Sequence, residues 1–333
     1  MTNRSIAVIG GGNGALTVAG GAAIAGHHVR LWDRFLSDHP LLMQSGTITL
    51  RGAVEGEAQI EQPRDDLAWT IADAELIEIV VPGYALAWIT SRLLPLVRPH
   101  QKVLLHPGGT GGALEVAQLW PADGALLGVT DTLAYATRLE SETSVVVHAE
   151  KKHLAVAAAA PDRIDVLLDV VRDVHPQAAA AGSIREVALS NLNPIIHPPI
   201  TLLNAGRIEA GQKFSLYGDG VGEGVGSLIA ALDRERLSLA EALGLNSLSL
   251  ESWVERAYGV AEPSMVELFA RLDREVYGGL AAPTSLNSRY LTEDIPLGLE
   301  VFVELAAESH VDMPVTESVV RVARVLINKM EGP

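Results

Sequence analysis

The sequence predicts a two-domain α/β protein, with an N-terminal Rossmann-type parallel sheet that has helices on both faces, followed by an all-α C-terminal domain. From Ser5 to about Gly182, short apolar runs alternate with segments of helix length, which is the pattern of βαβ units. A glycine-rich turn directly follows the first of these runs. After Gly182 the strand signal fades and apolar residues recur at helical spacing. We therefore expect a Rossmann domain over residues 1–182 and a helical domain over residues 183–333.

Each predicted strand of the first domain is a short apolar run rich in β-forming residues. The expected strands are Ile6–Ile9, His28–Trp32, Ile77–Val81, Lys102–Leu105, Leu126–Val129 and Ser144–His148. The domain boundary is expected at Ala178–Ser183, where an alanine run ends in Gly-Ser. The expected helices of the second domain are Glu186–Arg207, Ser227–Leu243, Ser264–Tyr277 and Thr316–Met330.

The bulk composition excludes several classes of protein. A chain of 333 residues can form two domains that each bury a core, so neither a metal nor a disulfide is needed for stability. Cysteine is absent, which removes thiolate metal sites and thiol nucleophiles and fits a reducing, cytoplasmic compartment. The net charge of −16 would repel nucleic acid, which is therefore not an expected partner.

Neither an export signal nor a membrane span is expected. The chain enters an apolar strand and a glycine turn within its first ten residues, which leaves no room for a leader. The apolar runs elsewhere are far shorter than the roughly 20 residues that cross a bilayer. We expect a cytoplasmic protein, and long apolar helices such as Ser227–Leu243 make a homodimer the expected assembly.

The first glycine-rich turn predicts a dinucleotide site. Gly10, Gly12 and Ala15 form the pattern G-x-G-x-x-A between a strand and a helix, with Asn13 and Gly14 completing the turn. The first glycine allows a sharp turn, the second allows close approach of a pyrophosphate, and the alanine keeps the helix close to the sheet. Free backbone N–H groups and the helix dipole then face the anion.

The choice of dinucleotide depends on two adjacent residues. Asp33 ends the second strand about 20 residues after the turn, where a carboxylate reaches a ribose hydroxyl and repels a 2′-phosphate. Arg34 can instead receive that phosphate, or can be a solvated arginine. We expect NAD(H) or NADP(H), with NAD preferred. Pro82 and Gly83 end another strand and open a helix, a position that faces the ligand in open α/β sheets.

Later motifs resemble those of the opine dehydrogenase family over nearly the whole chain. The glycine-rich stretch His106–Glu115 and the stretch Thr132–Arg138 resemble substrate-side turns of the family, although the family commonly has a proline where this chain has Ala134. The pattern N-P-x-x-H-P at 193–198 and the pattern R-Y-x-x-E-D-x-P at 289–296 resemble its helical domain. The glycine-rich stretch alone is equally compatible with a plain connection between a strand and a helix.

This resemblance implies reductive coupling. An α-keto acid such as pyruvate and the amine of an amino acid, or another amine, form an imine that NAD(P)H reduces to a secondary amine. The resemblance implies that His197 is the catalytic acid/base, Asp294 its partner and Arg289 a carboxylate-binding group. The remaining expected substrate-side residues are Asn193, Thr110, Tyr135 and Arg138.

The residues themselves support this chemistry but leave alternatives. Histidine suits proton transfer near neutral pH, and Asn193 would share a helix face with His197 if Pro194 only begins or kinks the helix. A histidine in such a segment can also be a core or capping residue. A carboxylate such as Asp294 can orient an imidazole, but it can also lie in a solvated turn, and neighbouring Glu293 competes for the role.

Two other patterns carry no site. The glycine-rich stretch Gly218–Gly226 is expected to be a flexible loop, because its acidic residues oppose a phosphate and Ser227 can cap the helix that follows. No metal site is expected, since the other histidines show no ligand spacing with one another or with carboxylates.

Rival functions have their own signatures. A ketone, 2-hydroxy-acid or glycerol-3-phosphate-type dehydrogenase shares the architecture, and those that polarise the carbonyl with lysine need an ammonium group in the helical domain. Between Lys152 and Lys329 this chain has only Lys213, without companions that resemble a site. A non-catalytic dinucleotide sensor would have lost the histidine or its carboxylate, and both are present.

Overall fold

The computed structural model describes residues 3–330, with side chains described up to residue 327. The outer ends of both expected domains, residues 1–2 and 331–333, lie outside this range. The chain forms two compact units. The first, the Rossmann unit, comprises the residues up to Gly108 together with Gly112–Val187, and the second, the helical unit, comprises Gly109–Gly111 and the residues from Ala188 onward. The predicted fold class, a Rossmann-type parallel sheet and an all-α part, is confirmed.

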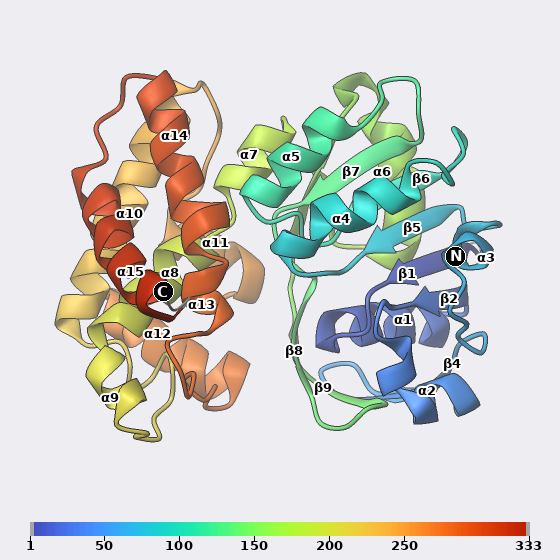
Figure 1. Cartoon of the computed structure of the whole chain (residues 1–333), viewed down its shortest axis with the longest axis horizontal. Coiled ribbons are helices and arrows are strands. Elements are labelled where there is room, and N and C mark those ends of the chain that lie inside the picture. The colour runs from blue at the N-terminus through green and yellow to red at the C-terminus, as the bar shows by residue number, and fades with distance from the viewer. Residues whose placement is uncertain (1–2, 331–333) are drawn as a thin grey trace. The chain divides into compact units, whose positions relative to one another are not determined.

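The Rossmann unit is built on a seven-stranded sheet in the order β11-β10-β7-β6-β5-β1-β2 (Figure 1). Five neighbouring strands are parallel, and β10 runs antiparallel to β7. The strands are β1 (Ser5–Ile9), β2 (His28–Trp32), β5 (Leu76–Ile79), β6 (Lys102–Leu105), β7 (Leu126–Thr130), β10 (Leu154–Ala158) and β11 (Ala178–Ala180). The five predicted strands of this sheet are present within one or two residues at each end.

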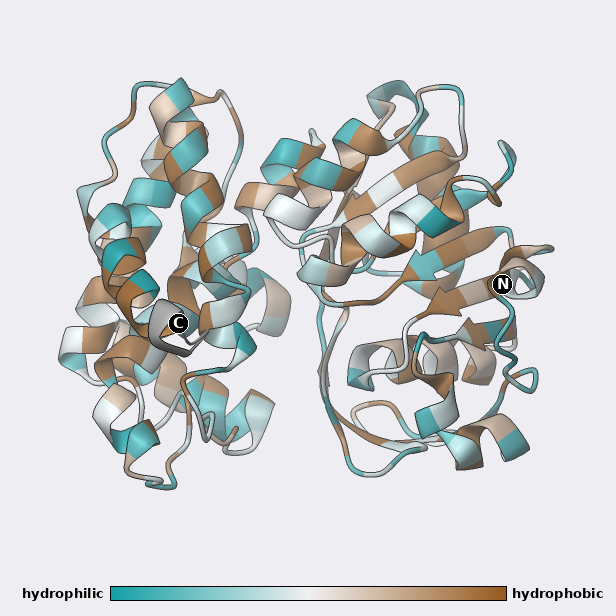
Figure 2. Ribbon diagram, viewed as in Figure 1, coloured by the Kyte–Doolittle hydropathy of each residue, from teal (hydrophilic) through white to brown (hydrophobic). Residues whose placement is uncertain are grey.

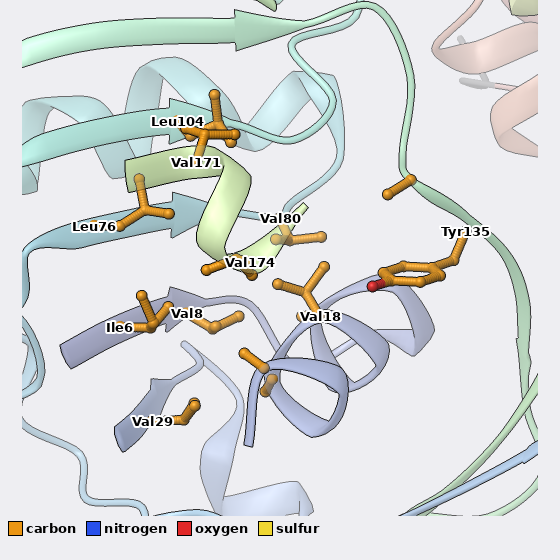
Figure 3. Close-up of a cluster of buried hydrophobic side chains, with 14 of the residues drawn as sticks. Ile6, Val8, Val18, Val29, Leu76, Val80, Leu104, Tyr135, Val171 and Val174 are labelled. Atoms are coloured by element: carbon orange, nitrogen blue, oxygen red, sulfur yellow. The ribbon is translucent and has the colours of Figure 1, made fainter. Parts of the chain in front are cut away.

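Helices bury both faces of this sheet, which explains why its central strands are apolar at nearly every position. Ile6 and Val8 face α1 and α6, whereas the alternate residues Ala7 and Ile9 face α4 and α5. Figure 3 shows Ile6 and Val8 beside side chains of α1 and α6, and in Figure 2 the strands are mostly brown. The helices of the unit are α1 (Asn13–Ile24), α2 (Pro40–Ser45), α3 (Leu67–Ile71), α4 (Gly83–Leu93), α5 (Gly111–Leu119), α6 (Ile164–Val174) and α7 (Ile184–Leu189).

A second, four-stranded sheet in the order β4-β3-β9-β8 was not predicted. The segment Ser144–His148 was expected to belong to the main sheet, but as β9 it pairs with β3 and β8 instead. The place beside β7 is taken by β10, whose apolar residues pack on the main sheet. The strands of the second sheet are β3 (Thr47–Gly52), β4 (Gly56–Gln59), β8 (Tyr135–Leu139) and β9 (Ser144–Glu150).

The helical unit departs from the predicted helix boundaries in three places. The expected helix Ser264–Tyr277 is α12 up to Leu272 and a π-helical turn from Asp273 to Tyr277. The expected helix Glu186–Arg207 is three helices, because Pro194 lacks an N–H and begins a new helix, and Asn204 ends it. The helix expected to follow the glycine-rich stretch Gly218–Gly226 begins within it, at Glu223 with Gly222 as its N-cap, so Ser227 is inside the helix and not its cap. The helices are α8 (Asn193–Leu203), α9 (Ala205–Glu209), α10 (Glu223–Ala242), α11 (Leu250–Tyr258), α12 (Met265–Leu272), α13 (Arg289–Thr292), α14 (Glu300–Glu308) and α15 (Pro314–Met330).

Within residues 3–330 no helix is both long enough and apolar enough to cross a membrane.

A buried arginine connects α10 to its surroundings. The Arg236 side chain is fully buried, and its Nε and Nη2 donate to Oδ1 of Asp233 at 2.9 and 2.6 Å. Its remaining donors reach the carbonyls of Leu189 and Leu248 and the hydroxyl of Ser247. One guanidinium therefore joins α10 to the end of α7 and to the loop before α11.

We expect Arg236→Met to lower the free energy of unfolding by about 3–5 kcal/mol, because it leaves the buried Asp233 carboxylate without its cation. Urea unfolding measures the change. Arg321→Met is the control, since Arg321 pairs with Glu317 on the exposed face of α15, and we expect a loss below about 1 kcal/mol. Equal losses in the two variants would contradict this account of Arg236.

Candidate active site

The cofactor end of the Rossmann unit is the edge at which its parallel strands finish. Ile9 is aligned with Trp32 in β2 and with Ile79 in β5, and Ile79 is aligned with Leu105 in β6. The residues that follow these strands therefore lie along one edge of the sheet. They are Gly10–Gly12, Asp33 and Arg34, Pro82 and Gly83, and His106.

The glycine turn has the geometry that its motif predicts. Gly10 has φ +134°, and a Cβ on it would lie 2.3 Å from the carbonyl oxygen of Val80 and 3.2 Å from the Cβ of Ala15. Only glycine fits there, because both the backbone angle and the neighbouring strand exclude a side chain. Ala15 is fully buried, in keeping with its expected role in close packing of helix and strand.

Gly12 has a different environment from Gly10. It is the exposed N-cap of α1 with φ −76°, and a Cβ on it would meet no atom within 4 Å. The backbone angle suits any residue, so the fold does not require glycine at this position. The open space lies at the N-terminus of a helix, where backbone N–H groups attract an anion. The turn thus fits a dinucleotide pyrophosphate. The Asn13 side chain donates to the carbonyl of Thr137 at 2.7 Å, which ties the turn to β8.

Asp33 and Arg34 lie beside this turn. The Asp33 carboxylate accepts the Phe35 N–H at 2.9 Å and packs against Gly11, where a Cβ would lie 2.8 Å from its Cγ. The guanidinium of Arg34 is 4.7 Å from the ring centroid of Trp88 and 5.4 Å from that of Phe35. A carboxylate that can bind ribose hydroxyls and a cation that can bind a 2′-phosphate therefore lie next to each other, as the sequence suggested. Pro82 is the N-cap of α4, and Gly83 is its first residue.

A buried polar network lies below this edge, and sequence spacing did not reveal it. Glu78, His106 and His175 are fully buried, and their ligand-type atoms lie within 4.8 Å of one another. His106 Nδ1 and His175 Nε2 donate to the Glu78 carboxylate at 2.8 and 3.0 Å. Burial lowers the pKa of His106 to about 4, so its Nε2 is free to accept the Ala134 N–H at 2.9 Å. Glu78, His106 and His175 are therefore joined to one another and to the Ala134 backbone by hydrogen bonds.

The network fixes the segment that follows β7. Besides the Ala134 N–H held by His106, the carbonyl of Leu133 accepts from the buried ammonium of Lys151 at 2.6 Å. Burial lowers the pKa of Lys151 to about 8. The Leu133 side chain lies against Gly14, where a Cβ would be 3.0 Å from its Cδ2. Core side chains therefore position the residue that touches the cofactor turn.

Tyr135 and Arg138 of the stretch Thr132–Arg138 were expected on the substrate side, and the two differ in burial. Tyr135 belongs to the hydrophobic cluster of the Rossmann unit with 7% of its surface exposed, and its hydroxyl lies 3.4 Å from where a Gly21 Cβ would be (Figure 3). Burial raises its pKa. Tyr135 is therefore packed as a core residue, and its expected substrate contact stays a prediction. Arg138 is exposed near the end of β8, next to Thr137, whose carbonyl accepts from Asn13 of the glycine turn, and its expected substrate contact stays a prediction.

The helical unit brings the predicted acid/base pair together. Nδ1 of His197 lies 2.8 Å from Oδ2 of Asp294, across 97 residues of sequence. His197 is in the second turn of α8 and Asp294 lies two residues after the end of α13, and both side chains are largely buried. An ionised carboxylate can only accept a hydrogen bond, so the imidazole donates from Nδ1. Its Nε2 then carries the lone pair that can take up a proton. Glu293, the competing carboxylate, is not the residue in this contact.

Two tyrosines that sequence reasoning missed complete the surroundings of His197. The Tyr217 hydroxyl lies 3.2 Å from Nε2, and the Tyr290 ring lies 4.3 Å from the imidazole centroid at an interplanar angle of 37°. Tyr290 stands inside the motif that contains Arg289 and Asp294, so that motif was a signal for it. Tyr217 precedes the glycine-rich stretch that was read as a plain loop, and no local pattern marks it.

The other expected substrate residues differ in how they are used. Arg289 is exposed, and among residues 3–327 its side chain has no ion pair or hydrogen bond. Asn193 is the exposed first residue of α8, one turn before His197 as predicted. Thr110 is buried, donates to the carbonyl of Ala188 at 3.1 Å and accepts from the side chain of Asn191. Its hydroxyl is thus engaged within the helical unit.

The chain is similar to known proteins over most of its length. The model of the family described as NAD/NADP octopine/nopaline dehydrogenase, alpha-helical domain, matches residues 180–327. An opine dehydrogenase from Arthrobacter sp. (strain 1C) is 32% identical over 332 residues, which cover 98% of this chain and 92% of that protein.

Solved structures agree at the level of the fold. A structure of octopine dehydrogenase with NADH and L-arginine has a TM-score of 0.79 at 20% identity, over 98% of this chain and 90% of that one. A structure of yersinopine dehydrogenase with NADP⁺ has a TM-score of 0.76 at 16% identity, over 98% of this chain and 91% of that one.

We expect Gly12→Ala to fold normally and to bind dinucleotide at least about tenfold more weakly, because the new methyl group enters the space that a pyrophosphate needs. NADH titration by fluorescence and a thermal melt measure the two effects. Gly222→Ala is the matched control, since Gly222 is likewise an N-cap with no atom within 4 Å of its Cβ position. If Gly12→Ala bound NADH with wild-type affinity, the assignment of the pyrophosphate to this turn would be wrong.

Proposed function

Since the chain belongs to the opine dehydrogenase family, we propose that it couples an α-keto acid to an amine and reduces the resulting imine with NAD(P)H. The observation that carries the proposal is the 2.8 Å contact between His197 and Asp294 in the part of the chain that the family model matches. Opine dehydrogenases require one group that both gives and takes a proton, and an oriented imidazole supplies it.

In this proposal His197 handles the protons of the reaction at Nε2. The Asp294 carboxylate fixes the tautomer through Nδ1 and stabilises the imidazolium when it forms, as a carboxylate does beside a working histidine. The chemistry needs a proton when the hydroxyl of the amine–keto acid adduct leaves as water. A nicotinamide held by the glycine turn would supply the hydride for the imine carbon. Protein side chains perform the remaining work of binding and orientation.

Arg289 is the proposed partner of the keto-acid carboxylate. It is an arginine without an ion pair among residues 3–327, and its charge acts on Tyr217, which in turn contacts His197. A guanidinium offers two parallel donors that match the two oxygens of a carboxylate. We propose Asn193, on the same helix as His197, as a second polar contact for substrate.

The proposed cofactor contacts are those of the glycine turn and of the adjacent strand ends. Gly10, Gly12, Asn13 and Gly14 would hold the pyrophosphate, and Asp33 would hold the ribose hydroxyls of NAD(H). Arg34 is the residue that would accept a 2′-phosphate. We propose a preference for NADH, since the Asp33 carboxylate would repel that phosphate.

We expect NADH to be consumed only when an α-keto acid such as pyruvate and an amine are both present, as followed at 340 nm with a panel of amino acids and amines. Consumption with keto acid alone would instead indicate a 2-hydroxy-acid dehydrogenase.

His197→Ala should retain NADH affinity while turnover falls by at least about 100-fold, because the acid/base is lost. His100→Ala, at an exposed position of the Rossmann unit, is the control. Near-normal turnover in His197→Ala would remove His197 from the mechanism.

We expect Asp33→Ser to shift the ratio of NADPH to NADH affinity toward NADPH by at least about tenfold, because it removes the charge that opposes a 2′-phosphate. Serine keeps an oxygen for the Phe35 N–H, so the turn should persist. Separate titrations with the two cofactors measure the ratio. Asp38→Ser removes a nearby exposed charge and controls for net charge alone. An unchanged ratio in Asp33→Ser would contradict the proposed preference.

A further inference from the structure

We propose that the Tyr217 hydroxyl relays the proton between Nε2 of His197 and the substrate. This inference rests on the proposed function, and it adds a residue that neither the motifs nor the His197–Asp294 contact identifies. Three features of the helical unit carry it: the direction in which Nε2 points, the packing that holds both side chains, and the charges that surround the hydroxyl.

The first feature is the occupation of both imidazole nitrogens. Nδ1 of His197 is committed to Asp294 at 2.8 Å, so only Nε2 can exchange a proton with substrate. The atom in front of Nε2 is the Tyr217 hydroxyl oxygen at 3.2 Å. A hydroxyl can donate to neutral Nε2 and can accept from it once Nε2 is protonated. It is thus compatible with both states of the acid/base.

The second feature is that neither side chain is free to swing away. The Tyr217 side chain is 6% exposed, and its ring packs against Phe269 at 5.4 Å and edge-on to Tyr277 at 5.0 Å. His197 is held by Asp294 and by the Tyr290 ring at 4.3 Å. Displacing Tyr217 would give up both of these aromatic contacts, which stabilise the ring beyond its burial. A proton that leaves Nε2 therefore meets this hydroxyl first.

The third feature is the chemistry on the far side of the hydroxyl. The proposed carboxylate clamp, Arg289, immediately precedes Tyr290, whose ring packs on the imidazole, so it belongs to the segment beside the His197–Tyr217 pair. Burial raises the pKa of Tyr217 well above 10. The hydroxyl therefore keeps its proton throughout the neutral and alkaline range and does not act as a phenolate base.

The relay balances as a concerted transfer. Tyr217 gives its hydroxyl proton to the departing hydroxyl of the amine–keto acid adduct while it takes the proton of Nε2. The C–O bond breaks with its electron pair on the leaving water, and the nitrogen lone pair forms the C=N bond. Nε2 keeps the electron pair of its former N–H bond. Tyr217 is unchanged at the end, and His197 is neutral.

The test compares Tyr217→Phe with Tyr277→Phe. Both remove one buried hydroxyl from the same aromatic cluster, but the Tyr277 hydroxyl bonds that of Tyr258 at 2.9 Å and not the imidazole. We expect Tyr217→Phe to lower single-turnover rates by about 10- to 100-fold without a change in NADH affinity, because general acid–base transfer loses its direct path. Tyr277→Phe should stay within about twofold of wild type.

Rates in mixtures of H₂O and D₂O separate a relay from a structural role. Two protons in motion give a bowed dependence of rate on deuterium fraction, which we expect for wild type, and Tyr217→Phe should give a line. A linear wild-type dependence would overturn the relay without any variant, and so would a Tyr217→Phe rate within twofold of wild type. In either case the proposed function survives if NADH consumption still requires keto acid, amine and His197.

Discussion

The cofactor region depends on the register of the parallel strands, because that register makes neighbouring strands end at the same edge of the sheet. Ladder hydrogen bonds align Ile9 with Trp32 and with Ile79, so the residues after β1, β2 and β5 reach the same edge. This alignment brings the Val80 carbonyl so close to Gly10 that no side chain fits there. It also places Asp33 against the glycine turn. The turn, the acidic residue and the helix N-terminus are therefore consequences of one hydrogen-bonded register.

Much of this fold was predictable, because buried parallel strands are apolar at nearly every position and helices repeat with their own period. Those signals located the strands of the main sheet that run from Ile6–Ile9 to Leu126–Val129. The second sheet gave a weaker signal, since strands β3 and β4 are partly exposed, and of its four strands only β9 was predicted. Spacing along the chain also cannot tell which partner a strand selects, so Ser144–His148 was assigned to the wrong sheet.

The candidate site divides in the same way. His197 and Asp294 were found because each stands in a motif that resembles a known family, and their contact is present. Tyr135 stands in a similar motif, but a motif does not say which face of a strand a residue occupies, and this one faces the core. Tyr217 reaches His197 only through the packing of distant helices, which no local pattern encodes.

The network of Glu78, His106 and His175 has a consequence for how the cofactor region can diversify. Because the His106 imidazole holds the backbone N–H of Ala134, the path of this segment is set from inside the protein. The contacts with Gly14 are made by the side chains of Leu133 and Val80. Larger or smaller apolar residues at 133 can then reshape the floor beneath a dinucleotide without moving the chain. The backbone of this segment and the side chain that it presents to the glycine turn are thus set by different residues. Residue 133 can therefore change in evolution while the residues that hold the backbone stay the same.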